Sequence, residues 1–438
     1  MSNEMDSHIL FTNWRKNYPS LEHGEGVFLY DNTGKRYLDA IGGMFVVTIG
    51  YGVPEIGAAI AEQSTKLCFA NRNFFTHEAQ ERLADKLIGM APKGMDRIFF
   101  VPSGSTANEI ALQIARNYHV ERGQSSRYKV IGQWHNYYGA TVGALSMSGN
   151  LATRRRMHMD PYFLDFPHVQ APHCYHCPFQ RTYPACGLAC AHDLARVIEQ
   201  EGPASIAAFI ATPIIGGTAG AVVPPPGYHE TIRKICDTYG ILYIADEVIT
   251  GLGRLGTNFG IDHWNVTPDI ITLGKTLGSG YASLGAVLVH QHIWDTFTRG
   301  SRPGIVLLST YSGHPVSCAG ALAVQNYLTD HDLIKRCAVI GRYLKQALQR
   351  LAEREPLIGD VRGEGLLLGI ELVQDRATRE PFPRDAHVSD TVVRHAFEHG
   401  LLLSNRYGTG TRAEGDHISF SPPFVISEAE CDELVALL

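Results

Sequence analysis

The chain has 438 residues, of which 45% are apolar and 19% charged, so it can bury a large core and is not intrinsically disordered. Its 38 Lys and Arg residues against 44 Asp and Glu leave a net charge of −6, which argues against a general nucleic-acid binder, because neutralising phosphates requires a surplus of cations. No apolar run reaches the ~20 residues of a membrane-spanning helix, and residues 1–18 lack the apolar core of an export signal.

The first hundred residues predict a hairpin and two helices. Strand-forming segments at Val27–Tyr30 and Lys35–Leu38 flank the turn-forming residues Asp31–Gly34. Helical patterns follow at Pro54–Leu67, where the proline suits a first helical position, and at Thr76–Met90.

Strand and helix patterns alternate over the next two hundred residues. The predicted strands are Arg97–Val101, Tyr128–Gln133, Ser205–Ala211, Ile241–Asp246, Asp269–Leu273 and Ala282–Val289. Helical segments lie between several of them, at Thr106–Tyr118 and Tyr228–Tyr239. This alternation predicts an α/β fold with a mostly parallel sheet covered by helices.

After Pro315 the pattern changes to a smaller α+β unit. One long helix is predicted from Val316 towards Leu351. Strands at Leu366–Leu372 and His417–Phe420 then flank a helix near Val388–Glu398.

Gly251-Leu-Gly-Arg-Leu-Gly256 matches the G-x-G-x-x-G fingerprint of dinucleotide-binding proteins. That fingerprint lies in the first strand-to-helix turn and opens a helix. Here Thr257–Asp262 follows, which is not a helix start. We therefore expect a glycine-rich turn and not a nicotinamide site.

A phosphate site is indicated where the predicted strand Arg97–Val101 runs through Pro102–Ser105 into a helix. A Ser/Gly turn at a helix N-terminus offers free N–H groups, hydroxyls and the positive end of the helix dipole. The alternative is an ordinary capped helix with Ser105 or Thr106 as the N-cap.

Two further strands end in charged residues. The strand beginning at Ile241 ends in Asp246 and Glu247, and the next ends in Gly274-Lys275. A carboxylate at such a strand end reaches the region where α/β proteins bind ligands, and a partly desolvated lysine has a lowered pKa and can form a Schiff base. Each residue alone could equally be a surface charge.

Together the indicated phosphate site, Asp246 and Lys275 are the parts of a pyridoxal 5′-phosphate site. Such a site needs a lysine for the aldehyde, an acid that keeps the pyridine nitrogen protonated, and a helix terminus for the phosphate.

The sequence resembles the class III aminotransferases among the fold-type I pyridoxal-phosphate enzymes, over nearly the whole chain. The matching motifs are Ser103-Gly-Ser-Thr-Ala-Asn-Glu109, Tyr137-Tyr-Gly-Ala-Thr141, Pro224-Pro-Pro-Gly-Tyr228, Asp246-Glu-Val-Ile-Thr-Gly-Leu-Gly-Arg254, Thr272-Leu-Gly-Lys275 and Gly313-His-Pro315. The resemblance implies residues 51–315 as a large cofactor-binding domain with a seven-stranded type of sheet. Residues 316–438 would form a small α+β domain, which residues 1–50 join.

The resemblance also implies roles for individual residues. Lys275 would form the Schiff base with pyridoxal 5′-phosphate, and Asp246 would pair with the pyridine nitrogen. The other implied cofactor contacts are Val248 and Tyr137 on the two ring faces, Gly104 and Ser105 at the phosphate, and Thr310 at the phosphate of the neighbouring subunit. The last role implies a homodimer with composite active sites.

Substrate contacts are implied as well. Phe45 resembles the family's aromatic pocket residue, and Arg406 the mobile arginine that meets a carboxylate, with Arg412 as the alternative. Arg406 is expected in a loop whose glycines allow it to move. The branch acting on ornithine and γ-aminobutyrate has a Glu in the loop corresponding to Gly216–Gly220, whereas this loop has no carboxylate.

Other positions also depart from the family pattern. Tyr138 and Thr212 replace the His and Glu that are common there, and Ile249 replaces the Gln of the ornithine and γ-aminobutyrate branch. These departures favour the branch that pairs ω-amino acids or amines with pyruvate, by a ping-pong Schiff-base mechanism. The alternatives are a decarboxylase, racemase or aminomutase with the same cofactor, and, in another class, a nicotinamide-dependent dehydrogenase.

The nine cysteines are an odd number, and without an export signal they indicate a reducing, cytoplasmic setting. Four of them lie close together in the sequence, at Cys174, Cys177, Cys186 and Cys190, beside three histidines. They could bind structural zinc. We expect reduced thiols packed in an insertion, and no metal in the chemistry.

Overall fold

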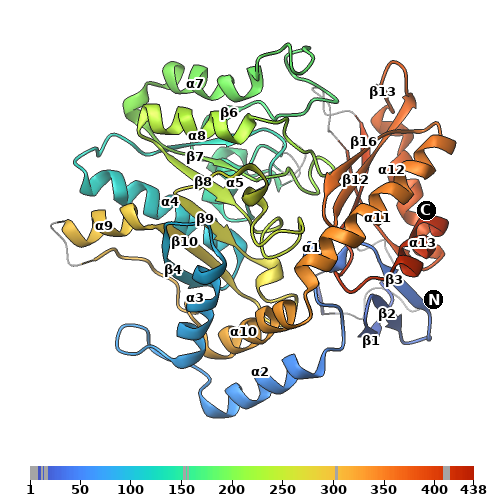
Figure 1. Ribbon diagram of the computed structural model, residues 1–438, viewed down its shortest axis with the longest axis horizontal. Coiled ribbons are helices and arrows are strands. Elements are labelled where there is room, and N and C mark those ends of the chain that lie inside the picture. The colour runs from blue at the N-terminus through green and yellow to red at the C-terminus, as the bar shows by residue number, and fades with distance from the viewer. Residues whose placement is uncertain are drawn as a thin grey trace.

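The computed structural model describes residues 8–10, 13, 18–150, 154, 157–300, 304–407 and 415–438. The chain folds around a central sheet, beside which the two ends of the chain form two smaller sheets (Figure 1). Within the described ranges, no helix has the length and apolar character needed to cross a membrane.

The central sheet has seven strands in the order β4-β10-β9-β8-β7-β5-β6. Their bounds are β4 Met95–Val101, β5 Lys129–Gln133, β6 His168–Val169, β7 Ile206–Ala211, β8 Leu242–Asp246, β9 Ile270–Leu273 and β10 Gly285–His290. The strands from β6 to β9 pair in parallel, and β10 runs antiparallel to both β9 and β4. The predicted mostly parallel sheet is therefore confirmed.

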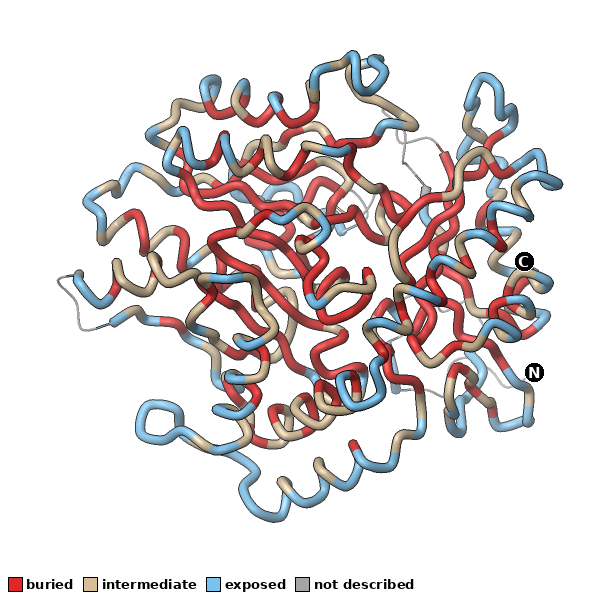
Figure 2. Tube along the Cα trace, viewed as in Figure 1, coloured by how far each residue is buried: buried red, intermediate tan, exposed pale blue. Residues whose placement is uncertain are grey.

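Helices cover both faces of this sheet, because successive side chains of a buried strand point to opposite sides. In β7, for example, Phe209 packs in one apolar cluster and Ile210 in another. The first cluster includes residues of α3 Glu78–Met90, α7 Ala189–Glu201 and α8 Tyr228–Tyr239; the second includes residues of α4 Gly104–Glu121 and α9 Gln291–Arg299. The buried residues accordingly follow the sheet strands (Figure 2). The short α5 is Val142–Met147.

The N-terminal sheet contains the predicted hairpin. Strands β2 Phe28–Asp31 and β3 Arg36–Asp39 pair antiparallel, with β1 Leu21–Glu25 beside β2. The late strand β14 Leu401–Leu402 pairs in parallel with β3. The first and last parts of the chain therefore fold together. After the hairpin come α1 Gly42–Phe45 and α2 Pro54–Lys66.

The C-terminal sheet is antiparallel, in the order β11-β12-β16-β15, with β13 on β12. Its strands are β11 Ile358–Glu364, β12 Leu367–Asp375, β13 Glu380–Pro381, β15 Ser404–Tyr407 and β16 Asp416–Phe420. The helices of this part are α10 Pro315–Asp330, α11 Leu333–Arg354, α12 Val388–Glu398 and α13 Glu428–Leu437.

The prediction of one continuous helix after Pro315 is wrong. Helix α10 ends at Asp330 and α11 begins at Leu333. Between them Asp332 has φ +49°, in the left-handed region that a right-handed helix cannot continue through. The apolar pattern on either side gives no sign of this break.

Candidate active site

Lys275 lies directly after β9, at the tip of the central sheet, with φ +43°. Its Nζ donates a hydrogen bond to the carbonyl of Met44 at 3.2 Å and lies 5.5 Å from the ring centroid of Phe45. Burial lowers the pKa of Lys275 to about 8, although the nearby charge of Asp246 raises it. A larger share of this amine is therefore neutral, and nucleophilic, than for an ordinary lysine.

Asp246 is the last residue of β8, the strand beside β9, and is buried. Oδ1 accepts the backbone N–H of Val248 at 2.9 Å, and Oδ2 accepts the side-chain amide of Asn108 at 2.8 Å. Burial raises the pKa of Asp246 to about 6, against the effect of these hydrogen bonds. Each oxygen keeps a lone pair, so a cationic N–H could bind here and hold the carboxylate ionised.

Asn108 is a site residue to which the sequence analysis gave no role. It lies in α4, fully buried, and its Nδ2 also donates to the carbonyl of Tyr138 at 2.6 Å. Its Oδ1 accepts the hydroxyl of Thr272 at 2.9 Å. A signal was available, because Asn108 is a polar residue within the apolar stripe of a helix that also contains Ala111 and Ala115.

The N-terminus of α4 is capped two to three residues earlier than expected. The backbone N–H of Thr106 donates to Oγ of Ser103 at 3.2 Å, so Ser103 is the N-cap, and neither Ser105 nor Thr106 is. Gly104 and Ser105 therefore lie in the first turn, whose N–H groups have no partner within a helix. The hydroxyl oxygen of Ser105 accepts the backbone N–H of Ala140 at 3.1 Å.

The N-terminus of α4 packs against the ends of β8 and β9. The contact is made by Gly104, Val248 and Gly274. A Cβ atom on Gly104 would lie 2.8 Å from Cγ1 of Val248, and one on Gly274 would lie 3.1 Å from the same atom. A Cβ on Gly104 would be too close to Val248, so that position needs glycine, and Val248 packs directly on both glycines. Tyr137 is exposed near this place, and its pKa is raised by partial burial and by the charge of Asp246.

Phe45 is buried with φ +63°, a conformation that costs energy for a residue with a side chain. Its ring rests on the glycine loop Gly216–Gly220: a Cβ on Gly217 would lie 2.6 Å from Cζ of Phe45. The predicted substrate residue therefore lies between this loop and Lys275.

Arg406 is expected in a loop, and this expectation is wrong. It lies in β15, because Ser404–Tyr407 pairs with β16. Its Nη1 donates to the carbonyl of Asn405 at 2.8 Å. Its charge contributes to lowering the pKa of Lys275, so the side chain lies near the site. The alternative, Arg412, falls in 408–414, outside the described residues.

Thr310 is exposed in the segment before α10, and no other predicted site residue is close to it among the described contacts. Several exposed apolar side chains lie in the same segment and in the connection from α2 to α3, at Phe69, Phe74, Phe75, Val306, Leu308 and Tyr311. Tyr311 and Phe69 are in edge contact, with ring centroids 6.0 Å apart.

The glycine sequence Gly251–Gly256 forms consecutive turns, which confirms the expected glycine-rich turn. Glu247 holds the residues that follow: its carboxylate accepts the backbone N–H groups of Gly260 and Ile261 at 2.9 and 2.8 Å and the hydroxyl of Thr250 at 2.5 Å. The Glu247 carboxylate therefore stabilises this turn, and Asp246 is the carboxylate that lies beside Lys275.

The four clustered cysteines, Cys174, Cys177, Cys186 and Cys190, line one small cavity, and all are free thiols. Burial raises the pKa of Cys190 to about 12. Within the described part of the chain, no three His, Cys, Asp or Glu side chains are grouped so that they could hold a metal ion. The zinc alternative therefore gains no support from the geometry.

The family model of the class-III aminotransferases matches residues 12–438. The chain belongs to this family. Its members are aminotransferases of the fold-type I class, which fits the sheet described above, and as a family they depend on pyridoxal 5′-phosphate.

Individual aminotransferases are similar over nearly their full length. An uncharacterised aminotransferase of Bacillus subtilis is 38% identical, covering 99% of this chain and 97% of the relative. The putrescine–pyruvate aminotransferase of Pseudomonas aeruginosa is 37% identical, covering 94% and 88%. The crystal structure of an (S)-enantioselective omega-transaminase from Thermomicrobium roseum superposes with a TM-score of 0.90 at 36% identity, covering 99% and 95%.

The residues of this class III aminotransferase fit the family's cofactor. A lysine with a lowered pKa and a buried carboxylate lie at the tips of adjacent strands. The N-terminus of α4, whose first-turn N–H groups have no partner within the helix, packs on Val248 close to Asp246. These are an amine for an aldehyde, an anion for a ring nitrogen and N–H groups for a phosphate.

Proposed function

We propose that this aminotransferase moves an amino group from an ω-amino acid or amine to a keto acid, pyruvate foremost, with pyridoxal 5′-phosphate as the carrier, in two half-reactions. The observation that carries the proposal is the placement of Lys275 and Asp246 at adjacent strand ends, each with its pKa shifted towards the neutral form by burial. Perturbed titratable pairs of this kind mark catalytic sites.

Each cofactor group has residues that would hold it. Lys275 would bind the aldehyde, and Asp246 would pair with the ring nitrogen. Val248 and Tyr137 would pack on the two ring faces. Gly104 and Ser105, in the first turn of α4, would bind the phosphate. When bound, the cofactor supplies an electron sink for the carbon that loses a proton.

Within the reaction, Lys275 is the group that moves the proton. With a lowered pKa, the free amine of Lys275 would be able to take a proton at Nζ from the substrate carbon and to donate it again. Asp246 acts by its charge, and Asn108 fixes the direction of that carboxylate from the helix side. A neutral group in place of Asp246 would remove the ion that keeps the ring nitrogen protonated.

The substrate assignment rests on Phe45, Arg406 and the loop Gly216–Gly220. An arginine beside Lys275 would bind the carboxylate of a keto acid. Because the loop has no acidic residue to neutralise it, the arginine must move away when an amine without an α-carboxylate binds. The name of the putrescine–pyruvate relative and the omega-transaminase structure support this pair of substrates.

We also propose a homodimer, located in the cytoplasm. The exposed apolar side chains around Phe74, Phe75 and Leu308 form a surface of the kind that another subunit covers. Thr310 lies within the same surface, where it could reach the cofactor phosphate of the second subunit.

The proposed function is tested by a donor screen on the purified protein with Lys275→Ala as the matched variant. The wild type should accept amines and ω-amino acids, favour pyruvate over 2-oxoglutarate, and release no carbon dioxide. Borohydride should fix the cofactor to the wild type and not to Lys275→Ala, whose circular dichroism should be unchanged. Carbon dioxide release with each turnover would instead identify a decarboxylase, and full activity of Lys275→Ala would contradict the site.

A further inference from the structure

A row of polar side chains crosses the C-terminal sheet near the proposed active site. Asp360 of β11 is opposite Glu371 of β12, Glu371 is opposite His417 of β16, and His417 is opposite Arg406 of β15. Residues directly opposite one another project from the same face of a sheet. The row therefore runs on one face from two acids, through a histidine, to the proposed substrate arginine.

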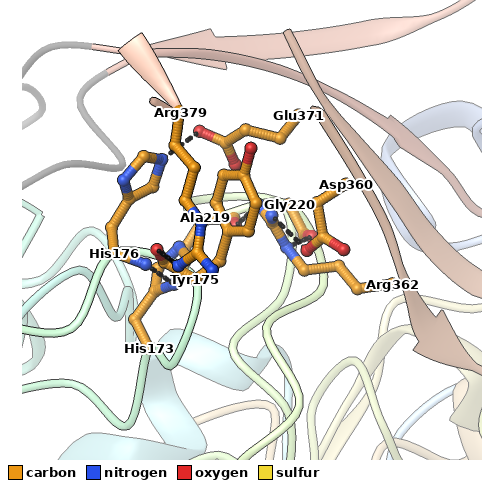
Figure 3. A network of polar contacts seen from close by, with 9 residues as sticks. All are labelled: His173, Tyr175, His176, Ala219, Gly220, Asp360, Arg362, Glu371 and Arg379. Carbon is orange, nitrogen blue, oxygen red and sulfur yellow. Dashed lines mark hydrogen bonds and ion pairs between the residues drawn. The ribbon is translucent and has the colours of Figure 1, made fainter. Parts of the chain in front are cut away.

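This face packs on the glycine loop that borders Phe45. Arg362 donates to the carbonyl of Gly220 through Nε at 2.7 Å and to that of Ala219 through Nη2 at 2.8 Å (Figure 3). The same guanidinium is paired with Glu371 at 2.5 Å and with Asp360 at 3.1 Å. Both acids of the row are thus already paired with the one cation that holds the loop.

His417 makes the third contact with the loop. Its Nε2 lies 2.9 Å from the carbonyl oxygen of Gly217. A carbonyl can only accept, so Nε2 carries the hydrogen and, in the neutral ring, Nδ1 has a free lone pair. Burial lowers the pKa of His417 to about 4, so the ring is neutral near pH 7.

Nδ1 of His417 is buried and, among the residues that the structure describes, has no hydrogen-bond partner. A buried acceptor without a partner is rare, because it has lost its water without replacement. Arg406 stands directly opposite, with side-chain origins ~5 Å apart in such a pair. Its charge affects both His417 and Lys275, so the guanidinium is within range of the row and of the active site.

We propose that His417 is a positioning residue for Arg406: its Nδ1 accepts the guanidinium when no carboxylate is bound, and gives it up when a keto acid enters. The inference rests on the proposed role of Arg406 in binding the carboxylate. It would give the arginine a second position on this face of the sheet, in a protein whose loop Gly216–Gly220 has no acidic residue.

The neutrality of the acceptor suits this exchange. A free carboxylate in the same place would hold the guanidinium by a full ion pair, and a keto acid would have to break it. Glu371 is paired with Arg362 and also lies 3.3 Å from Nε2 of His176, so it is not free for that role. A neutral imidazole gives a weaker bond, which an incoming carboxylate can replace.

Two substitutions separate this role from a structural one. Gln at 417 places an amide N–H near the position of Nε2, so it keeps the bond to Gly217 and removes the acceptor. Asn places its amide oxygen near the position of Nδ1, so it keeps the acceptor and loses the loop bond. His417→Gln and His417→Asn are each made in the wild type and in Arg406→Ala. Thermal unfolding checks that the four resulting proteins fold.

Two quantities are measured on the cofactor-loaded enzyme: the KM of an amine that lacks an α-carboxylate, and the calorimetric Kd of propionate as a carboxylate probe. His417→Gln should raise the ratio of amine KM to propionate Kd about tenfold, equivalent to about 1.4 kcal/mol, with propionate binding more tightly. His417→Asn should leave the ratio within about twofold of wild type. In the Arg406→Ala background, neither substitution should change the ratio of amine KM to propionate Kd.

Equal effects of Gln and Asn, or the same tenfold change without Arg406, would overturn the proposal and leave His417 as a support of the loop. Unchanged or weaker propionate binding in His417→Gln would overturn it too. A failure of the proposed function would be seen separately. If Arg406→Ala alone left the Kd of propionate unchanged, Arg406 would not bind the carboxylate.

Discussion

The side-chain amide of Asn108 donates to Oδ2 of Asp246 at 2.8 Å, across the boundary between α4 and the central sheet. The same amide group is anchored by the carbonyl of Tyr138 and the hydroxyl of Thr272. One buried residue therefore links the helix that offers its N-terminus to the strand that ends in the carboxylate. The distance from the proposed phosphate site to the proposed ring-nitrogen site is set by this link.

Replacing Asn108 with Ala should weaken both the fold and the site. It leaves the buried carboxylate and the Thr272 hydroxyl short of partners, which costs about 1–3 kcal/mol. We expect a lower free energy of unfolding in urea and weaker binding of pyridoxal 5′-phosphate, measured by equilibrium dialysis. Asn117→Ala, on the exposed side of the same helix, is the control and should stay within about 0.5 kcal/mol of wild type. Equal effects of the two changes would mean that the Asn108 bridge contributes nothing.

Asp246→Asn should remove a pH dependence from the stability of the cofactor-free protein and disable the enzyme. The pKa of Asp246 is raised from 3.8 to about 6, so the folded state binds protons more tightly than the unfolded state, and stability rises as pH falls from about 6 towards 4. Above pH 6 the buried charge costs up to about 3 kcal/mol; the amide carries no charge, but it has only one acceptor oxygen where the carboxylate has two for the Val248 and Asn108 N–H groups. The stability of the variant relative to wild type, measured by urea unfolding, should therefore rise by up to about 3 kcal/mol between pH 4 and pH 7.

The activity of Asp246→Asn should fall by several orders of magnitude, because an amide cannot keep the ring nitrogen protonated. The pH dependence of stability tests the buried charge itself, and the loss of turnover tests its pairing with the ring nitrogen. A loss of less than about tenfold in kcat would assign the ring nitrogen to another group.

Cofactor uptake should depend on pH through Lys275. Only the neutral amine attacks an aldehyde, and the pKa of this amine is lowered to about 8. The rate at which the apoprotein takes up pyridoxal 5′-phosphate, followed by absorbance, should rise with pH around a midpoint near 8 and then level off. A midpoint above 10, as for an exposed lysine, would show that burial does not act on this residue.

The sequence predicted the central sheet well, because each strand such as Ile206–Ala211 is a continuous apolar run between turn signals. It did not predict the antiparallel direction of β10, since an apolar strand buried on both faces looks the same in either direction. The strand around Arg406 was taken for a loop, because Ser404–Tyr407 is short and polar and depends on pairing with β16. Tertiary pairing of this kind leaves no local signal.

Among the site residues, Lys275 and Asp246 could be chosen from the sequence because charged residues end two apolar strands. Asn108 and His417 could not be assigned a role in the same way. Their chemistry depends on partners more than a hundred residues away, Asp246 for Asn108 and the carbonyl of Gly217 for His417. A polar residue in an apolar pattern indicates that some buried partner exists, but not which one.

Mixing subunits tests the composite site. If Thr310 serves the neighbouring subunit, a heterodimer of Lys275→Ala and Thr310→Ala subunits has one site with both changes and one site with neither. After denaturation and refolding together, the mixture should therefore be more active than the average of the two parents. An activity equal to that average, or a monomer in sedimentation, would contradict the shared site.

Gly104→Ala should impair cofactor binding more than it impairs folding. The added Cβ would lie 2.8 Å from Cγ1 of Val248, so Val248 or the first turn of α4 must shift where the phosphate and ring would bind. We expect the Kd for pyridoxal 5′-phosphate to rise at least tenfold, equivalent to about 1.4 kcal/mol. Gly89→Ala in α3 is the control, because its Cβ would meet nothing within 4 Å, and in a helix the change should stabilise by up to about 1 kcal/mol. If Gly104→Ala bound the cofactor as tightly as Gly89→Ala, the ring and phosphate would have to lie elsewhere than beside Val248.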